Sequence, residues 1–136
     1  MAILEAMEVA VRYLFVYGTL RPSLAGAEQL RLITGLTVAG PATVRGLLYD
    51  LGSYPALVTG PGIVHGDLFV VPDERQLAAL DAYEECGGDD PLYRREPTLA
   101  TLPDGSTVAA WAYFYERSLA AATGIESGDY SRRDTD

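Results

Sequence analysis

Glu84 is an ionisable residue at a position where the helical pattern predicts a core residue. We expect a helix over residues 73–85, with Leu77 and Leu80 marking its apolar stripe. At about 100° per residue, Glu84 falls between those two leucines on the helical wheel. Burial raises the pKa of a carboxyl group, which makes it a better proton acceptor near neutral pH. The pattern therefore indicates Glu84 as a catalytic general acid/base.

The loop after the first expected strand gathers a second set of residues suited to chemistry. Residues 13–17 are β-branched and aromatic and predict a buried strand, which ends abruptly at Gly18. A glycine-opened turn can point several backbone N–H groups at one spot and so bind a carboxylate or a developing oxyanion. Thr19 adds a hydroxyl, and Arg21 can hold a carboxylate through two hydrogen bonds. The candidate binding residues of this segment are Tyr17, Gly18, Thr19, Leu20 and Arg21.

Both features also have an ordinary structural explanation, which the residues alone leave open. Glu84 could pair with Arg94 or Arg95, or lie at a frayed helix end that faces water. The glycine-opened segment could be a simple turn at the end of a strand, with Arg21 in solvent. The alternatives differ in what lies opposite the two segments, which is a property of the tertiary structure.

Strands dominate the elements that must position these residues. The expected strands cover residues 13–17, 43–51 with a possible bulge at Gly46, 56–58, 63–71, 93–102 and 107–115. The expected helices cover 27–33, 73–85 with Asp73 as N-cap, and 117–123. Residues 103–106 are a strong hairpin signal. We therefore predict an α+β fold, a small and mostly antiparallel barrel-like sheet with two or three short helices.

Length and charge exclude several classes of protein. The 136 residues suit one domain, which we place at residues 13–126, with 1–12 and a polar, frayed 127–136 as terminal extensions. The formal net charge of −9 argues against a nucleic-acid partner and against an anionic membrane surface. The single cysteine, the absence of a signal-peptide pattern and the absence of a long apolar run favour a cytoplasmic protein.

The metal-ligating residue types do not form a recognisable site. His65 is the only histidine, and Cys86 has no second cysteine to pair with or to share a metal. Asp89 and Asp90 are read as a solvated acidic loop, because a calcium loop needs more oxygen ligands at regular spacing. The sequence therefore predicts neither a metal site nor thiol catalysis.

Five segments in order resemble the γ-glutamylcyclotransferase-like superfamily, including its AIG2-like group. The resemblance covers about residues 13–115, most of the chain, and no one segment is decisive alone. The matching segments are Tyr17-Gly18-Thr19-Leu20-Arg21, residues 46–57, residues 64–71, Leu80-Asp81-Ala82-Tyr83-Glu84, and the pair 92–95 and 110–115. The resemblance implies a small mixed barrel with a pocket at one mouth and places the family's catalytic glutamate at Glu84.

The resemblance also implies a reaction. A γ-glutamyl amide or γ-glutamylamine would cyclise to 5-oxoproline and release its amine, without a cofactor, in a monomer or homodimer. Tyr49, Tyr93 and Tyr115 are candidates to line the pocket, although such tyrosines are more often half-buried sheet residues. The backbone around Gly18 would face the oxyanion.

One departure from the family pattern leaves the function open. The family has glycine after its catalytic glutamate, whereas this chain has Glu85 and a longer acidic insertion at 86–90. This segment borders the expected pocket, so it bears mainly on which substrate fits. The alternative is a non-catalytic protein of the same fold that binds a small amino-acid-like ligand. A purely structural interaction domain explains least, because it leaves the carboxylate at a core position unaccounted for.

Overall fold

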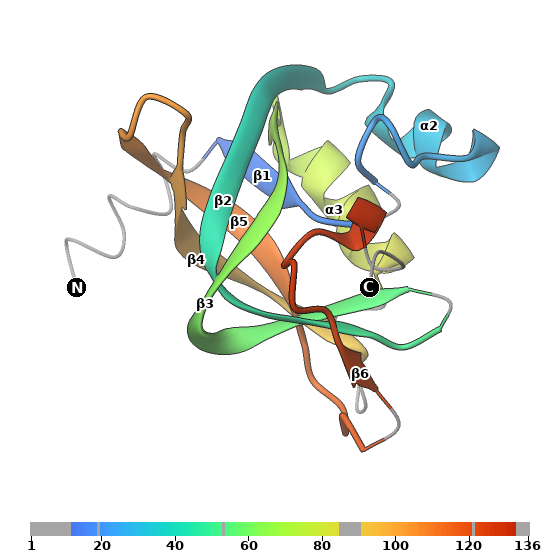
Figure 1. Ribbon diagram of the computed structural model, residues 1–136. Helices are drawn as coiled ribbons and strands as arrows, with labels where there is room; N and C mark the ends of the chain where they lie inside the picture. Colours follow the sequence, from blue (N-terminus) through green and yellow to red (C-terminus); the bar gives the residue numbers. More distant parts are fainter. Residues whose placement is uncertain (1–11, 19, 53, 85–90, 121, 133–136) are drawn as a thin grey trace, which may run out of the picture.

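Alternating apolar side chains let five strands close into a small barrel (Figure 1). The computed structural model describes residues 12–18, 20–52, 54–84, 91–120 and 122–132. Its strands are β1 (Tyr13–Val16), β2 (Thr37–Asp50), β3 (Pro55–Val70), β4 (Tyr93–Thr101), β5 (Thr107–Tyr115) and the short β6 (Thr123–Gly124). Its helices are α2 (Ala27–Ile33), α3 (Glu74–Tyr83) and a 3-10 turn at Tyr130–Arg132.

The order of the strands around the barrel is β3-β1-β5-β4-β2, and pairing of β2 with β3 closes it, while β6 adds to β2. Only the β1–β5 pair is parallel among these described strands. The predicted α+β class, a small mixed and mostly antiparallel β-barrel with short helices, is therefore confirmed.

The long strands β2 and β3 bend around the barrel at glycines. Their register shifts between Arg45 and Leu47, at the predicted Gly46 bulge. A Cβ atom on Gly46 would lie 2.7 Å from Leu57 Cδ1 and 2.8 Å from Val58 O, so the close crossing of the strands requires glycine there. The segments expected as two strands, 56–58 and 63–71, are one continuous strand because both pair with β2.

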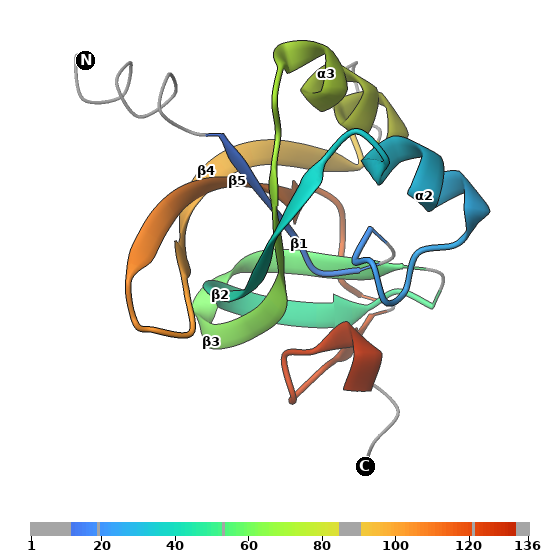
Figure 2. The same cartoon turned by 90° about the horizontal axis from the view of Figure 1, so that it is seen from above.

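Apolar side chains form two layers. Phe15, Leu57, Leu68 and their neighbours fill the barrel. On its outside, Leu14, Val16 and Leu80 belong to a second cluster beneath the helices. Figure 2, which looks down on the barrel, shows α2 and α3 together on one side of it. The pleat of β1 supplies both layers, because successive side chains point to opposite faces.

Helix α3 begins as its sequence predicts. The Asp73 side chain accepts a hydrogen bond from the Gln76 N–H at 3.1 Å, so the predicted N-cap is confirmed. The helix runs over Glu74–Tyr83, with Glu84 as C-cap, whereas the expected last residue, Glu85, lies outside the described residues. Among the described residues, no helix combines the length and the apolar character needed to cross a membrane.

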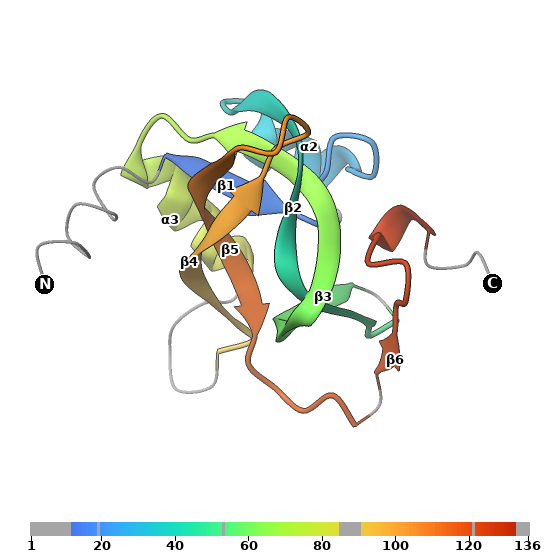
Figure 3. The same ribbon diagram turned by 60° about the vertical axis from the view of Figure 1, so that its left-hand side comes forward.

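The C-terminal segment differs from the prediction in two places. The helix expected over 117–123 is wrong: Thr123 pairs with Asp50 of β2, and a helix this short is marginal unless packing supports it. The frayed end expected from residue 127 is also wrong as far as Arg132. Tyr130 is only 4% exposed and packs with the barrel core. Figure 3 shows this segment running beside β2 and β3.

Candidate functional site

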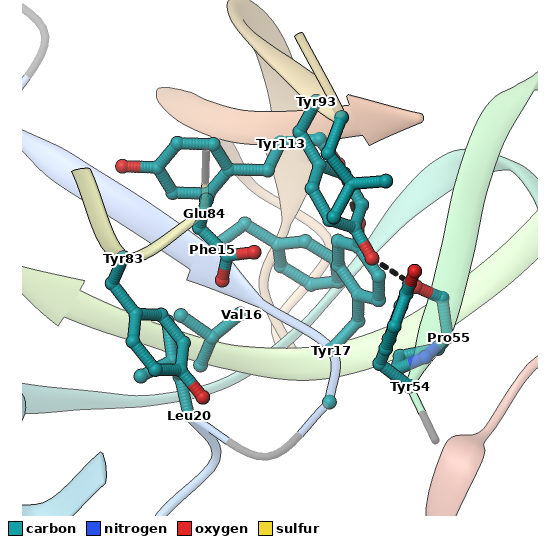
Figure 4. A pocket seen from close by; sticks show the side chains of 12 residues that line it. Phe15, Val16, Tyr17, Leu20, Tyr54, Pro55, Tyr83, Glu84, Tyr93 and Tyr113 are labelled. Atoms are coloured by element: carbon teal, nitrogen blue, oxygen red, sulfur yellow. Dashed lines mark hydrogen bonds between the residues drawn. The ribbon is translucent and has the colours of Figure 1, made fainter. Parts of the chain in front are cut away.

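A cavity of about 230 Å³ opens where β1 and α3 both end. Figure 4 shows Tyr83 and Leu20 on one side of it, and Tyr93, Tyr54 and Pro55 on the other. The cavity is lined by Phe15, Val16, Tyr17, Gly18, Leu20, Tyr54, Pro55, Tyr83, Glu84, Leu92, Tyr93 and Tyr113. It is the kind of concave, mostly apolar space with a few polar groups that binds small molecules.

Glu84 brings a carboxylate to this cavity from the end of α3 (Figure 4). Its backbone N–H donates to the Leu80 carbonyl oxygen at 2.9 Å, so the last turn of the helix holds it in place. Leu80 itself is completely buried. The structure therefore places Glu84 at the wall of this cavity, and the residue is half-buried rather than exposed at a frayed end.

The turn after β1 supplies the opposite part of the wall. Gly18 and Leu20 line the cavity, and the Arg21 N–H donates to the Gly18 carbonyl oxygen at 2.9 Å, which closes a tight turn. A Cβ atom on Gly18 would lie 2.7 Å from Pro55 Cγ, so this close approach of the turn to the Pro55 ring favours glycine. Thr19, also predicted for the site, lies outside the described residues.

Tyr93 is a buried hydroxyl donor on the far wall. Its O–H donates to the Pro55 carbonyl oxygen at 2.6 Å. Burial, and next the nearby Glu84 carboxylate, raise the pKa of Tyr93 well above its ordinary value. The ring packs against Tyr54 and Tyr115, with ring centroids 6.3 and 5.6 Å away. Tyr93 therefore keeps its proton and supports the wall next to the carboxylate.

Two more hydrogen bonds connect the walls to each other. The Tyr17 hydroxyl donates to the Tyr113 carbonyl oxygen, and the Tyr113 hydroxyl donates to Asp81 Oδ1 at 2.7 Å. This chain of contacts runs from the end of β1 across β5 to α3. The Tyr83 hydroxyl accepts from Gln29 Nε2 at 2.8 Å, which ties the cavity wall to α2.

The structure brings together five of the residues predicted for the site: Tyr17, Gly18, Leu20, Glu84 and Tyr93. Three others do not line the cavity. Arg21 turns away and pairs with Asp67 and Asp129, Tyr49 borders a separate hollow near β6, and Tyr115 packs edge-on against Tyr93. Their assignment to the pocket is corrected. Ion pairs direct Arg21 elsewhere, and strand alternation points Tyr49 away from the core that Leu48 enters. Tyr115 shares a strand face with Tyr113 but packs against the Tyr93 ring.

Most of the aromatic wall was not predicted from the sequence. Phe15, Tyr54, Tyr83 and Tyr113 line the cavity without having been candidates. Tyr83 was within reach of prediction, because it immediately precedes Glu84 at the end of the expected helix. Tyr54 and Tyr113 carried no such signal, since their place depends on which strands meet at the barrel mouth.

A larger hollow of about 660 Å³ lies on the other side of α3. It is bordered by Arg12, Asp81, Arg95 and Trp111 among others, and holds none of the residues predicted for the site. Two of its charged groups bind each other, because Arg95 donates to both Asp81 oxygens. Within the part of the chain that the structure describes, no three His, Cys, Asp or Glu side chains are grouped so that they could hold a metal ion.

Known proteins resemble this chain in sequence and in fold. Residues 14–132 match the family described as gamma-glutamyl cyclotransferase, AIG2-like. The gamma-glutamylcyclotransferase family protein YtfP of Escherichia coli K12 is 38% identical over 122 residues, which are 89% of this chain and 97% of that protein. A relative of the same family name from Citrobacter rodentium is also 38% identical, over 89% of this chain and 96% of its own.

Solved structures agree with these matches. The solution structure of ytfP from Escherichia coli superposes with a TM-score of 0.64 at 36% identity, over 90% of this chain and 99% of that one. The crystal structure of an AIG2-like protein from mouse has the same fold, with a TM-score of 0.64 at 23% identity over 81% of this chain and 78% of its own. On these matches, and with a carboxylate at the mouth of the barrel, the chain belongs to the AIG2-like gamma-glutamyl cyclotransferase family.

Proposed function

We propose that this protein is an enzyme that cyclises a γ-glutamyl amide or γ-glutamylamine to 5-oxoproline and releases the amine, with Glu84 as general acid/base. The observation that carries the proposal is that Glu84 and the glycine-opened turn line one cavity. They come from elements far apart in the sequence, and the reaction needs both a proton carrier and a place for a developing oxyanion. Membership of the family supports the same reaction class.

The proton balance of this reaction suits a single carboxylate. The free α-amine of the substrate attacks its own γ-carbonyl carbon, a C–N bond forms, and the bond to the leaving nitrogen breaks. The substrate ammonium group starts with three protons and the lactam keeps one. Two protons therefore pass to the leaving nitrogen, which departs as an ammonium ion. Glu84 can carry them one at a time, and acid–base help of this kind contributes on the order of 10²–10⁴-fold.

The remaining walls would supply orientation and polarisation. Backbone N–H groups of the turn at Gly18 and Leu20 are the candidates to bind the oxyanion, worth roughly a further 10²–10³-fold. Aromatic side chains surround the space, so water is displaced and the glutamyl chain can be held in a folded conformation. No arginine, lysine or histidine is among the described lining residues, so neutral donors would have to hold the substrate carboxylate.

The test is release of 5-oxoproline from a panel of γ-glutamyl compounds: dipeptides, γ-glutamyl-ε-lysine, γ-glutamyl amines and γ-glutamyl antibiotic precursors. Glu84→Gln preserves shape and removes the proton acceptor, so we expect turnover to fall by at least about 10²-fold with an unchanged melting temperature. Glu96→Gln is the matched control, because Glu96 lies on β4 in an exposed pair with Arg94, and we expect full activity.

Two results would contradict the proposal. Glu84→Gln with the activity of the wild type would remove the carboxylate from the chemistry. Binding of several panel compounds without any 5-oxoproline would instead favour the alternative, a protein of the same fold that binds an amino-acid-like ligand. Calorimetric titration of the same compounds distinguishes that outcome from a protein that does not recognise them.

A further inference from the structure

Arg21 is held by two carboxylates from distant parts of the chain. Its Nε donates to Asp67 Oδ2 of β3 at 2.9 Å, and its Nη1 donates to Asp129 Oδ1 at 2.9 Å. All three side chains are mostly buried, with 13%, 18% and 16% exposed in that order. Pairs with this little exposure are screened weakly by salt, so they can hold a segment in place.

Asp129 is itself fixed to the barrel through the segment around it. The Ile125 N–H donates to the Leu48 carbonyl oxygen of β2 at 2.8 Å, and the His65 N–H of β3 donates to the Gly128 carbonyl oxygen at 2.7 Å. Tyr130 is buried in the barrel core directly after Asp129. The chain beside Asp129 is therefore anchored on both sides.

Gly128 shows how closely this segment lies against β3. Its φ is +68°, and a Cβ atom there would lie 2.0 Å from the Ile63 carbonyl oxygen. A left-handed conformation and a contact this close both require glycine. Ser131 donates its backbone N–H to Asp129 Oδ1 at 3.0 Å. Burial disfavours the Asp129 carboxylate, but the hydrogen bonds from Ser131 and the charge of Arg21 outweigh burial and lower its pKa.

The turn that Arg21 terminates is the one that lines the cavity. The Arg21 N–H donates to the Gly18 carbonyl oxygen, and the Leu24 N–H donates to the Arg21 carbonyl oxygen, both at 2.9 Å. Moving the Arg21 side chain would therefore move the backbone whose Gly18 and Leu20 form part of the cavity wall. We propose that Asp129 is a positioning residue, which acts through Arg21 to hold this turn in the geometry that the reaction needs. This inference rests on the proposed function and adds to it a role for the C-terminal segment.

The experiment compares Asp129→Asn and Arg21→Lys with an exposed ion pair of the same chemistry. The control variants are Glu116→Gln and Arg94→Lys, whose side chains form a pair at 3.0 Å that is 33% and 43% exposed. Each variant is assayed for 5-oxoproline release below its melting temperature. An oxyanion donor acts in the transition state, so we expect Asp129→Asn to lower kcat by about 10–100-fold and to change KM by less than about threefold.

The second variant tests the direction of the effect. Lysine keeps the charge but cannot donate to both carboxylates in the same forked geometry, so Arg21→Lys should fall between wild type and Asp129→Asn. The control pair should keep kcat within about twofold. A lower melting temperature of Asp129→Asn with an unchanged kcat would show that Asp129 has a structural role only, and would overturn the proposal.

Hydrogen exchange keeps this test separate from the proposed function. In Asp129→Asn, the amides of Arg21 and Leu24 should exchange about tenfold faster or more, while the control variants leave them unchanged. This measurement needs no substrate, so it stands even if the wild type turns over nothing in the panel. Wild-type exchange rates at both amides in Asp129→Asn would overturn the positioning role.

Discussion

Replacing Arg95 by alanine should destabilise the protein far more than replacing its neighbour Arg94. Arg95 Nε and Nη2 donate to the two Asp81 oxygens at 2.8 and 3.2 Å, which connects β4 to α3. The Tyr113 hydroxyl also donates to Asp81. The Arg95 guanidinium lies 4.2 Å from the centroid of the Trp111 ring. Loss of Arg95 therefore leaves the partly buried Asp81 carboxylate with the Tyr113 hydroxyl as the one remaining partner of those described above.

The size of the effect follows from burial. The Arg95 and Asp81 side chains are 23% and 27% exposed, so the pair lies between an exposed pair, worth roughly 0.2–1 kcal/mol, and a fully buried one, whose disruption costs roughly 3–5 kcal/mol. With about 1.5 kcal/mol for the charged hydrogen bonds and about 1 kcal/mol for the stacking on Trp111, we expect a loss of about 2.5 kcal/mol.

Arg94 is the matched control, because it is the preceding residue and points to the other face of β4. It pairs with Glu96 and Glu116, lies 5.6 Å from the centroid of the Phe114 ring, and has a side chain that is 43% exposed. Exposed ion pairs contribute about 0.5 kcal/mol, and a cation–π contact at this exposure adds about 0.5 kcal/mol. For a chain of this length about 1 kcal/mol corresponds to roughly 3–4 °C, so the two alanine variants should melt about 5 °C apart.

Urea denaturation followed by circular dichroism gives the free energies of unfolding directly. Equal losses for Arg94→Ala and Arg95→Ala, within about 0.5 kcal/mol, would refute the reasoning, because they would show that the contact between β4 and α3 contributes no more than a surface pair. Arg95→Ala should also reduce turnover, since Asp81 lies one helical turn before Glu84.

Three further predictions concern the cavity. Gly18→Ala places a Cβ atom 2.7 Å from Pro55 Cγ and should lower the free energy of unfolding, measured by urea denaturation, by about 1–3 kcal/mol. Gly124→Ala, where the nearest atom is 3.9 Å away, should lower it by less than about 1 kcal/mol. Equal losses for the two variants would contradict the close approach at Gly18. Because burial raises the pKa of Tyr93, above about pH 10 the unfolded chain loses this proton while the folded chain keeps it. The free energy of unfolding should then fall by up to about 1.4 kcal/mol per pH unit. Tyr93→Phe should make this dependence of the unfolding free energy on pH less steep. The same pH dependence in the variant and the wild type would count against a buried, protonated Tyr93. Glu84 is the acidic residue among the described lining residues, and none of the others is basic. Compounds with a cationic leaving amine should therefore show about tenfold higher kcat/KM than those with an additional carboxylate. The reverse order would indicate a cation at the cavity that the described residues do not include.

Local sequence signals predicted best those helices and strands whose bounds do not depend on distant residues. The helix Ala27–Ile33 and the strand Thr107–Tyr115 have the predicted bounds, and the hairpin signal at 103–106 joins the two strands expected around it. In each case glycine, proline or a capping residue acts within a few residues of the boundary. The start of β2 at Thr37 was missed, because Gly40 and Pro41 normally argue against a strand and pairing with β3 outweighs them.

The residues of the candidate site likewise divide into those that a local pattern predicts and those that distant contacts place. Residues 77–84 predict an inward carboxylate because helical periodicity is a local property, and the structure places Glu84 at the cavity. The direction of Arg21 is not local. Its side chain is set by Asp67 and Asp129, which lie 46 and 108 residues further along the chain, and no pattern around residue 21 contains that information.

The sequence by itself therefore determined the barrel class, the main helix with its N-cap, and a carboxylate on that helix's apolar face. The tertiary structure alone decided that β1 and α3 end at one cavity, that tyrosines from five segments surround it, and that the arginine of the first loop binds the C-terminal segment instead of facing the cavity. The physical reason is range: periodicity and capping act over a few residues, whereas cavities and ion pairs form between strands that meet only when the barrel closes.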